Sequence, residues 1–157
     1  MPQNPPAGYH TLTPSLIVKD ARKAIDFYKR AFGVTEVDVM TGPDGKVMHA
    51  ELKIGDSMFM MGEENPAWAQ YKSAETLGGS PISLHLYYPD VDAAFQRALD
   101  AGAKVEMPVD TMFWGDRYGK VIDPFGHGWG ILTHKEDMSM AEMEKRGKEW
   151  LASMAKG

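Results

Sequence analysis

Two periods of hydrophobicity alternate along the chain, one typical of strands and one typical of helices. Residues 12–20 form a mostly apolar run that ends at Asp20, as expected of a strand that is followed by a helix N-cap. Residues 20–33 then repeat apolar side chains at helical spacing as far as Gly33, and glycine commonly ends a helix. This pattern predicts a strand followed by a helix.

Three further strands are predicted after this helix. Residues 34–41 alternate apolar and polar side chains, and residues 47–62 do the same on both sides of a turn at Gly55-Asp56. A turn at residues 42–46 separates the two segments. The first half of the chain therefore has the predicted order β-α-β-β-β.

The second half of the chain repeats this order. Residues 80–90 resemble the first strand, residues 90–103 have helical spacing, and residues 104–133 supply further strands and tight turns. The positions that we equate are Asp20 with Asp90, Ala24 with Ala94, Ile25 with Phe95, Gly33 with Gly102 across a one-residue gap, and residues 45–55 with 119–129, which both begin GKV. A repeat of roughly 70 residues predicts two copies of one module.

The predicted organisation is a single domain over residues 1–157. We expect module one at about 8–62, a polar, Gly- and Pro-containing linker at about 63–80, and module two at about 81–134. A C-terminal helix is predicted at about 139–155, which either folds back on its own domain or contacts a partner subunit.

Composition and charge narrow the classes of partner. The formal net charge is −5 and no cluster of Lys and Arg is present, which argues against a nucleic-acid-binding surface. No apolar stretch approaches the roughly 18 residues of a membrane-spanning helix, and the N-terminus lacks the regions of a signal peptide. The absence of cysteine excludes disulfides, thiolate metal ligands and a cysteine nucleophile. We therefore predict a cytoplasmic protein without a nucleic-acid or membrane partner.

The ordered set of motifs resembles the vicinal oxygen chelate (VOC) superfamily, which includes glyoxalase I, the extradiol dioxygenases and the bleomycin-resistance proteins. The segments that resemble it are TPSLIVKDARKAIDFYKRAFG, GKVMHAELKIGD, SLHLYYPDVDAAFQRALDAGA and GDRYGKVIDPFGHGWGI. They are most similar to the PhnB-like branch of the glyoxalase/bleomycin-resistance group. The resemblance implies an α+β fold in which two tandem βαβββ modules form an open barrel or cup, with helices outside and the binding site inside. It also implies a homodimer.

In the metal-using members of this superfamily, four side chains on the first and last strands of the modules bind a metal ion. The resemblance places these positions at Thr13, Phe59, Ser83 and Gly130, or at Met58 or Met60 if the second position shifts by one residue. None of these residues offers the imidazole or carboxylate donors that divalent metal ions prefer. We therefore expect no metal in the family site and no cofactor.

Strand alternation indicates which side chains face the cup. In residues 47–54, His49 and Glu51 are expected to point inward, and in residues 82–88 the same holds for His85 and Tyr87. The residues expected to face the helices are Met48, Ala50, Leu52 and Ile54 in the first segment and Ile82, Leu84, Leu86 and Tyr88 in the second.

Four roles are open for His49, Glu51 and His85. They contact a ligand without catalysis, satisfy each other's hydrogen bonds, transfer a proton, or form a two-His, one-carboxylate metal set. We rank ligand contact first and the metal set last.

Residues 112–120 (MFWGDRYGK) offer two more ligand contacts. Trp114 has a flat face for stacking, and Arg117 can donate two parallel hydrogen bonds to a carboxylate or phosphate. The alternative is a structural turn in which Trp114 covers the core and Arg117 pairs with Asp116 or Asp123. The remaining histidines are not expected in the site, with His127 and His134 on the surface and His10 in an N-terminal arm.

The function that these features favour is that of a PhnB-like glyoxalase/bleomycin-resistance-type protein, which binds a small organic molecule in its cup without a metal ion. Flexible methionines and aromatic rings would give such a cup an adaptable apolar wall. The candidate substrate-binding residues are His49, Glu51, His85, Tyr87, Trp114 and Arg117. The alternative is a glyoxalase-like lyase or isomerase, or a dioxygenase-like enzyme, that uses His49, Glu51 and His85. A structural or regulatory dimer ranks last.

Overall fold

The computed structural model covers residues 1–157 and describes all of them except the side chains of Glu36 and Val37. The elements in chain order are β1 (Ser15–Val18), α1 (Ala21–Phe32), β2 (Glu36–Thr41), β3 (Val47–Ile54), β4 (Ser57–Glu63), α2 (Ala74–Leu77), β5 (Ser83–Tyr87), α3 (Val91–Ala101), β6 (Lys104–Thr111), β7 (Asp116–Ile122), β8 (Gly128–His134) and α4 (Met140–Met154). This α+β arrangement of two β-α-β-β-β modules and a C-terminal helix confirms the predicted fold class.

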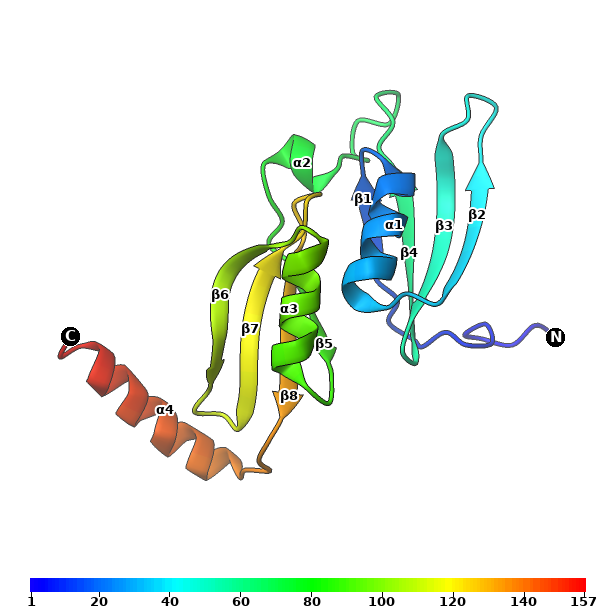
Figure 1. Ribbon diagram of the computed structural model, residues 1–157. Coiled ribbons are helices and arrows are strands. Elements are labelled where there is room, and N and C mark those ends of the chain that lie inside the picture. Colours follow the sequence, from blue (N-terminus) through cyan, green and yellow to red (C-terminus); the bar gives the residue numbers. More distant parts are fainter.

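The two modules form separate four-stranded sheets with the same connectivity (Figure 1). Module one has the strand order β1-β4-β3-β2 and module two has the order β5-β8-β7-β6. In each sheet the first strand pairs in parallel with the last, and the other pairs are antiparallel. The internal repeat is therefore confirmed at the level of topology.

The predicted helix ends are also confirmed. The Asp20 side chain accepts a hydrogen bond from the backbone N–H of Lys23 (3.1 Å), and Asp90 caps α3 in the same way through Ala93 (3.1 Å). Helix α1 ends at Gly33, whose φ of 75° lies in the left-handed region that favours glycine. The equivalent sequence signals in the two modules thus produce equivalent helices.

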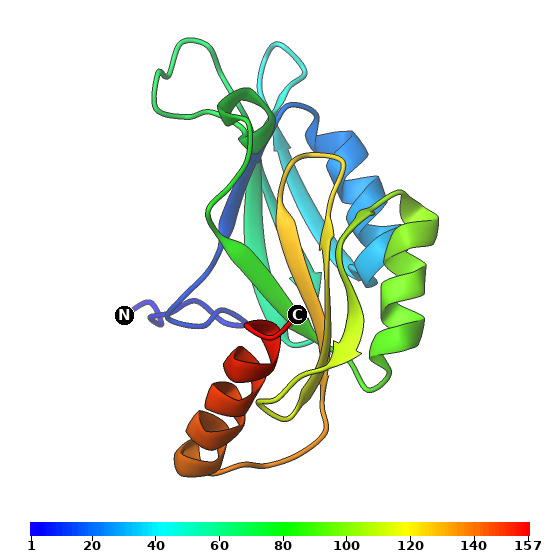
Figure 2. The ribbon, with the colours of Figure 1, turned by 90° about the vertical axis from the view of Figure 1, so that its left-hand side faces the viewer.

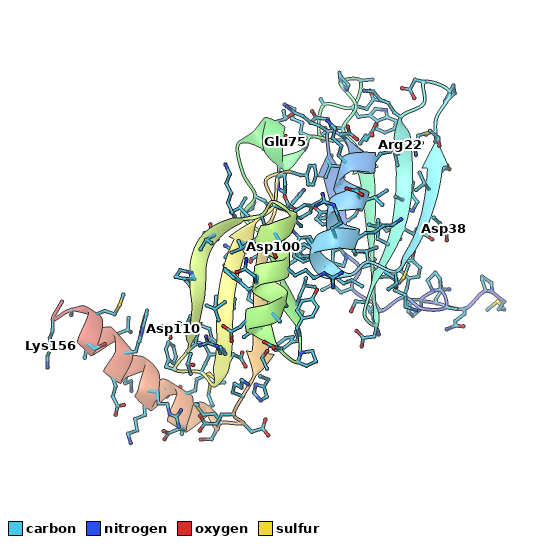
Figure 3. All side chains as sticks on the ribbon, in the orientation of Figure 1. Arg22, Asp38, Glu75, Asp100, Asp110 and Lys156 are labelled. Atoms are coloured by element: carbon cyan, nitrogen blue, oxygen red, sulfur yellow. The ribbon has the colours of Figure 1, made fainter. Side chains whose placement is uncertain are left out.

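Helices α1 and α3 contact each other and lie together on one side of the strands (Figure 2). The N-terminal arm and α4 lie on the other side. Side chains fill the space between each helix and its sheet (Figure 3). Each sheet consequently has one face covered by a helix and one face that we call its open face.

The core joins the two modules through aromatic side chains. Trp129 of module two packs against Phe32 and Tyr28 of α1, with ring centroids 4.6 and 5.3 Å apart. Phe27 and Phe59 complete the cluster, and all five side chains are buried. Aromatic pairs of this kind add about 0.5–1.5 kcal/mol each beyond their buried area.

A buried carboxylate stabilises the same region. Asp123, in the turn between β7 and β8, is 3% exposed. It accepts hydrogen bonds from the Tyr28 hydroxyl (2.6 Å), the Trp129 indole (2.8 Å) and the backbone N–H groups of Phe125 and His127. The sequence analysis considered Asp123 only as a possible partner of Arg117 and missed its role in joining module two to α1.

The predicted alternation of β3 is wrong at its first two residues. Val47 is buried in the core, whereas Met48 is 47% exposed. The register between β2 and β3 shifts between Met40 and Thr41, and such a bulge reverses the faces of the residues beyond it. From His49 onward the alternation holds, because Ala50 is fully buried. In module two the helix-facing prediction fails only at Ile82, which precedes β5 and is 67% exposed.

The proposed equivalence of residues 45–55 and 119–129 is also wrong. Gly45 lies in the turn before β3, whereas Gly119 lies inside β7 and faces Phe95 of α3. The two GKV sequences therefore occupy different places in their modules, and their similarity does not reflect the repeat.

The connections contain one helix that was not predicted. The linker folds into the short helix α2, which is capped by the buried Ser73. The predicted C-terminal helix is present and begins after Ser139, whose hydroxyl accepts from the Glu142 N–H (3.2 Å). Every helix in the described part of the chain is too short or too polar to traverse a bilayer.

Candidate functional site

A hollow of about 630 Å³ lies between the two modules, along the edge strand β5 of module two and the turn between β3 and β4 of module one. Its volume is within the range of small-molecule sites. The residues that line it are His10, Leu12, Pro14, Phe32, Gly33, Thr35, Ile54, Gly55, Asp56, Ser57, Met58, Phe59, Leu84, His85, Leu86, Tyr87, Tyr88, Arg97 and Trp129. Apolar and aromatic side chains predominate, with a few polar groups among them.

The hollow contains two of the residues that the sequence analysis nominated, His85 and Tyr87. Both lie on β5 with their side chains exposed, and Tyr87 is 66% exposed. The next residue, Tyr88, donates its hydroxyl to the carbonyl oxygen of Phe32 (2.9 Å), and burial raises the pKa of Tyr88 to about 12. A neutral phenol therefore fixes the end of β5 against α1.

His85 fills the space in which metal-using relatives carry a ligand. A Cβ atom at Gly130 would lie 2.7 Å from His85 Cδ2, 3.0 Å from His85 Nε2 and 2.7 Å from Tyr118 Cε2. Real Cβ contacts are essentially never shorter than 3.0 Å, so a side chain at this position requires both rings to move. The imidazole and the phenol ring thus replace the side chain that glycine lacks.

An aromatic row continues from His85 across the open face of module two. The His85 and Tyr118 ring centroids are 5.5 Å apart, and those of Tyr118 and Trp114 are 5.9 Å apart. Trp114 is held in place because its indole N–H donates to Asp116 (3.0 Å). The structure therefore brings the nominated residues His85 and Trp114 into one row through Tyr118.

Tyr118 is a residue that the sequence analysis missed. Burial raises its pKa, so the phenol is neutral at ordinary pH. The signal that could have found it is the alternation in β7, which places Tyr118 on the same face as Asp116 and Lys120. His10, which lines the hollow, was likewise given no role, and no pattern in the sequence indicates its position.

The nominated residues His49 and Glu51 lie on the open face of module one. His49 Nε2 is 3.6 Å from Glu51 Oε1, and both side chains are more than a third exposed. The N-terminal arm places Tyr9 beside them. Burial raises the pKa of Tyr9 to about 12, with further contributions from the approach of its hydroxyl to the Glu51 carboxylate and from the charges of Glu51 and Asp38. Among the described residues, the buried hydroxyl makes no hydrogen bond of good geometry. Neither His49 nor Glu51 lines the hollow.

Arg117 does not reach the open face. It lies on the helix-covered side of β7 and donates two hydrogen bonds to Asp92 of α3, at 2.9 and 2.8 Å. These bonds lower the pKa of Asp92 and raise that of Arg117. The predicted pairing of Arg117 with Asp116 or Asp123 is therefore wrong, because its guanidinium pairs with Asp92.

His127 is also not a surface residue. It is 8% exposed, and its Nε2 lies 3.2 Å from the carbonyl oxygen of Ile17. The five-residue turn that Asp123 organises directs this ring against β1, which corrects the expectation of a solvent-exposed side chain.

The four family metal positions do not provide a metal site. Thr13 Oγ1 donates to the His10 carbonyl, and Phe59 packs in the core rather than on the open face. The open-face residue of β4 at this level is Met60, which lies opposite Glu51. Among the described residues, no group of three histidine or acidic side chains is suited to a metal ion. His49, Glu51 and His85 therefore do not form the two-His, one-carboxylate set, and the residues present do not fit a metal.

Two sheets with equivalent connectivity, open faces and a hollow between them define a known class of small-molecule scaffold. The chain belongs to the Glyoxalase/Bleomycin resistance protein/Dioxygenase superfamily, which it matches over residues 9–131.

Named relatives agree with this assignment. The uncharacterized protein Rv0887c of Mycobacterium tuberculosis is 45% identical over 135 residues, which cover 85% of this chain and 79% of the relative. The crystal structure of TioX from Micromonospora sp. ML1 is 25% identical with a TM-score of 0.63, covering 80% of this chain and 98% of TioX. TnmS3, an antibiotic binding protein from Streptomyces sp. CB03234, has the same fold, with 22% identity, a TM-score of 0.61, and coverage of 80% of this chain and 96% of TnmS3.

Proposed function

We propose that this protein binds a small, partly apolar organic molecule in the hollow between its modules, without a bound metal ion. The observation that supports this most directly is the position of His85. Its ring contributes to the wall of the hollow and also begins the aromatic row through Tyr118 to Trp114. A flat aromatic ligand could stack on this row while an apolar part enters the hollow.

The class of ligand is supported by a relative as well as by the lining. TnmS3 is named as an antibiotic binding protein, and we extend binding of a comparable organic molecule to this chain. The polar groups near the apolar floor, among them His85 and Tyr87, would orient such a molecule.

A metal-dependent reaction is not favoured by the residues of the site. Imidazole or carboxylate donors are missing from the family positions, and a glutamate at Gly130 would collide with His85 and Tyr118. The enzyme alternative that combined His49, Glu51 and His85 is less favoured, because His85 lines the hollow and His49 and Glu51 do not.

We also propose that the chain forms a homodimer and belongs to the PhnB-like branch of its superfamily. The open faces of both sheets leave apolar side chains exposed, including Met40 and Tyr87, and burial of such surface favours association. Light scattering tests the dimer, and a mass equal to one chain of 17.4 kDa contradicts it.

A thermal-shift screen with flat aromatic compounds tests the binding proposal. A compound that binds the folded state raises the melting temperature by mass action, and the increase should persist in protein treated with a chelator. The affinity of the best compound is then measured for His85→Ala and for the matched control His49→Ala. We expect a loss of about tenfold or more for His85→Ala, corresponding to roughly 1.4 kcal/mol, and no change for His49→Ala.

Three results would overturn the proposal. Loss of binding after chelation, restored by one equivalent of a divalent metal, indicates a metal site. If wild type and His85→Ala bind the compound with equal affinity, the hollow is not the binding site. If only His49→Ala loses affinity, the compound binds on the open face of module one.

A further inference from the structure

The strand β8 ends at a histidine that lies between two carboxylates. His134 Nδ1 is 2.7 Å from Asp116 Oδ1, and His134 Nε2 is 2.8 Å from Asp137 Oδ1. A carboxylate accepts hydrogen bonds and donates none, so each of these contacts requires a proton on the ring nitrogen. Neutral imidazole has one N–H group, and only the imidazolium form satisfies both contacts.

The two carboxylates belong to different parts of the molecule. Asp116 begins β7, and its side chain is 10% exposed. Asp137 lies on the connector between β8 and α4, with a fully exposed side chain. Protonated His134 therefore joins the connector to the sheet.

The connector and α4 have few other attachments to the body. The backbone N–H groups of Lys135 and Glu136 both donate to the Gly115 carbonyl oxygen (3.0 Å each). The Phe113 ring packs on Trp150 of α4, with centroids 5.6 Å apart. None of the fifteen described residues of α4 is buried, and Figure 3 shows Lys156, just beyond its end, far from both sheets.

The remaining charges near His134 are paired with one another. Arg146 of α4 donates to Glu136 at 3.0 Å through two nitrogens and to Glu142 at 2.9 Å. These contacts hold α4 to the connector and not to the sheet. Arg117 and Asp92 pair on the far side of β7, and Lys135 on the connector is the other cation in this region.

Helix α4 lies beyond the part of the chain that the superfamily shares. The family match ends at residue 131. Two solved relatives that are covered over 98% and 99% of their lengths correspond to only 80% and 81% of this chain. A property of α4 is therefore not a property of the common scaffold.

We propose that His134 is a proton-operated latch that fixes the direction of α4. The latch is closed when the ring is an imidazolium that bridges Asp116 and Asp137. When the ring loses a proton, the Nδ1–H bond to the largely buried Asp116 persists, and the contact with the exposed Asp137 is replaced by water. The connector is then held only by the Gly115 carbonyl and the Phe113 packing, and α4 samples a wider range of directions.

The pH range follows from the sign of the histidine shift. The hydrogen bonds to Asp137 and Asp116 raise the pKa of His134 above its ordinary value. The contribution of the latch is fully present below the unfolded pKa, near 6.5, and is lost as pH rises through the raised folded pKa. Helix α4 is thus held in one direction at acid pH and is released as the pH becomes alkaline.

The same carboxylate connects the latch to the aromatic row. Asp116 uses Oδ1 for His134 and Oδ2 for the indole N–H of Trp114. Titration of His134 should therefore also shift the indole N–H resonance of Trp114, which the variant Trp114→Phe identifies among the four tryptophans.

The absence of cysteine allows a direct test in the full chain. The substitutions Lys104→Cys on β6 and Ser153→Cys on α4 introduce the only two thiols, and a spin label is attached to each. Distances are measured at about pH 5.5 and about pH 8.5, which bracket the ordinary histidine range. We expect a narrow distribution at the lower pH and a broader one at the higher pH. His134→Gln, which has no imidazolium, should give the broad distribution at both.

Histidine NMR provides a second, independent measurement. The pKa of the His134 ring should lie above about 6.5 in the wild type and should move back toward that value in Asp137→Asn, which removes one of the two flanking negative charges while its amide oxygen can still accept from the ring. A wild-type distance distribution that is the same at both pH values overturns the latch. A pH response that persists in His134→Gln, or a His134 titration that Asp137→Asn leaves unchanged, overturns it equally.

Discussion

Modules one and two have the same strand pairing and the same helix-covered face, but they differ at the turn between their last two strands and on their open faces. In module one, β3 and β4 are joined by the tight turn Gly55-Asp56, which is exposed. In module two, a five-residue turn begins at Asp123 and is buried against α1. The shared helix-facing surface provides the core, and the unshared parts determine what each module can bind.

The open faces show the same divergence. Module one presents a solvated His49–Glu51 pair, which the N-terminal arm approaches through Tyr9. Module two presents aromatic rings above Gly130. A duplicated module thus keeps the residues that pack on its helix and varies the residues that face away from it, where substitution has a smaller effect on stability.

The largest expected loss of stability distinguishes the buried turn at Asp123 from the exposed turn at Gly55-Asp56. Asp123→Ala removes the acceptor of four hydrogen bonds, two of them from buried aromatic side chains. Buried donors without partners cost about 1–3 kcal/mol each when they cannot reach water. We expect the free energy of unfolding to fall by about 3–5 kcal/mol, which urea denaturation will measure.

Asp56→Ala is the matched control in module one. Asp56 is exposed, and its side chain accepts a hydrogen bond from the neighbouring Ser57 hydroxyl (3.1 Å). A change within about 0.5 kcal/mol is expected. Equal losses for Asp56→Ala and Asp123→Ala would show that the two turns are equally important and would remove this contrast between the modules.

This contrast also shows what the sequence could and could not predict. Alternation and helical spacing, with capping residues at Asp20 and Asp90, were sufficient for the order of strands and helices, because each signal is local. The role of Asp123 depends on Tyr28, which is 95 positions away in the chain. A partner at that separation leaves no local pattern.

A smaller loss of stability is expected for a substitution at Gly130 on the open face of module two, where the neighbouring side chains leave no room for a Cβ atom. Gly130→Glu restores the acidic residue of metal-using relatives, but its Cβ would lie 2.7 Å from both His85 and Tyr118. Because His85 is exposed and can move, we expect a destabilisation of about 1–3 kcal/mol, measured by thermal or urea unfolding, and no specific metal binding.

Met60→Glu is the corresponding change in module one. Met60 occupies an open-face position opposite Glu51 and is partly exposed, so the expected cost is that of two like charges facing each other across the strands, about 0.2–1 kcal/mol. A loss for Met60→Glu that equals the loss for Gly130→Glu would contradict the claim that His85 and Tyr118 fill the ligand position. Tight binding of one divalent ion by Gly130→Glu would contradict the absence of a metal geometry.

The site was harder to anticipate than the fold for a physical reason. Alternation assigned His49, Glu51, His85 and Tyr87 to open faces, but it could not show that only His85 and Tyr87 line the hollow. Arg117 was misplaced because its partner Asp92 lies on α3, and an isolated sequence does not show which of several carboxylates an arginine meets. Residues of one strand could be grouped by face, whereas contacts between modules required coordinates.

The smallest expected effect distinguishes two tyrosines whose pKa values are both raised to about 12. Tyr88 donates its hydroxyl to the Phe32 carbonyl and joins module two to α1 (2.9 Å), whereas the Tyr9 hydroxyl over module one has no partner among the described residues. Tyr88→Phe should lower the free energy of unfolding by about 1 kcal/mol at neutral pH. Tyr9→Phe should change it by less than about 0.5 kcal/mol.

The dependence of the free energy of unfolding on pH above 10 provides a second comparison of the two tyrosines. A tyrosine with a pKa of about 12 in the native protein and about 10 when unfolded binds its proton more tightly in the folded state. Stability is therefore unaffected by these groups below pH 10 and falls as pH rises from about 10 to about 12. Urea unfolding across this range should show a shallower decline in each Tyr→Phe variant than in the wild type. A decline that both variants leave unchanged would mean that neither hydroxyl is shielded, and the arm over module one would then lie in solvent.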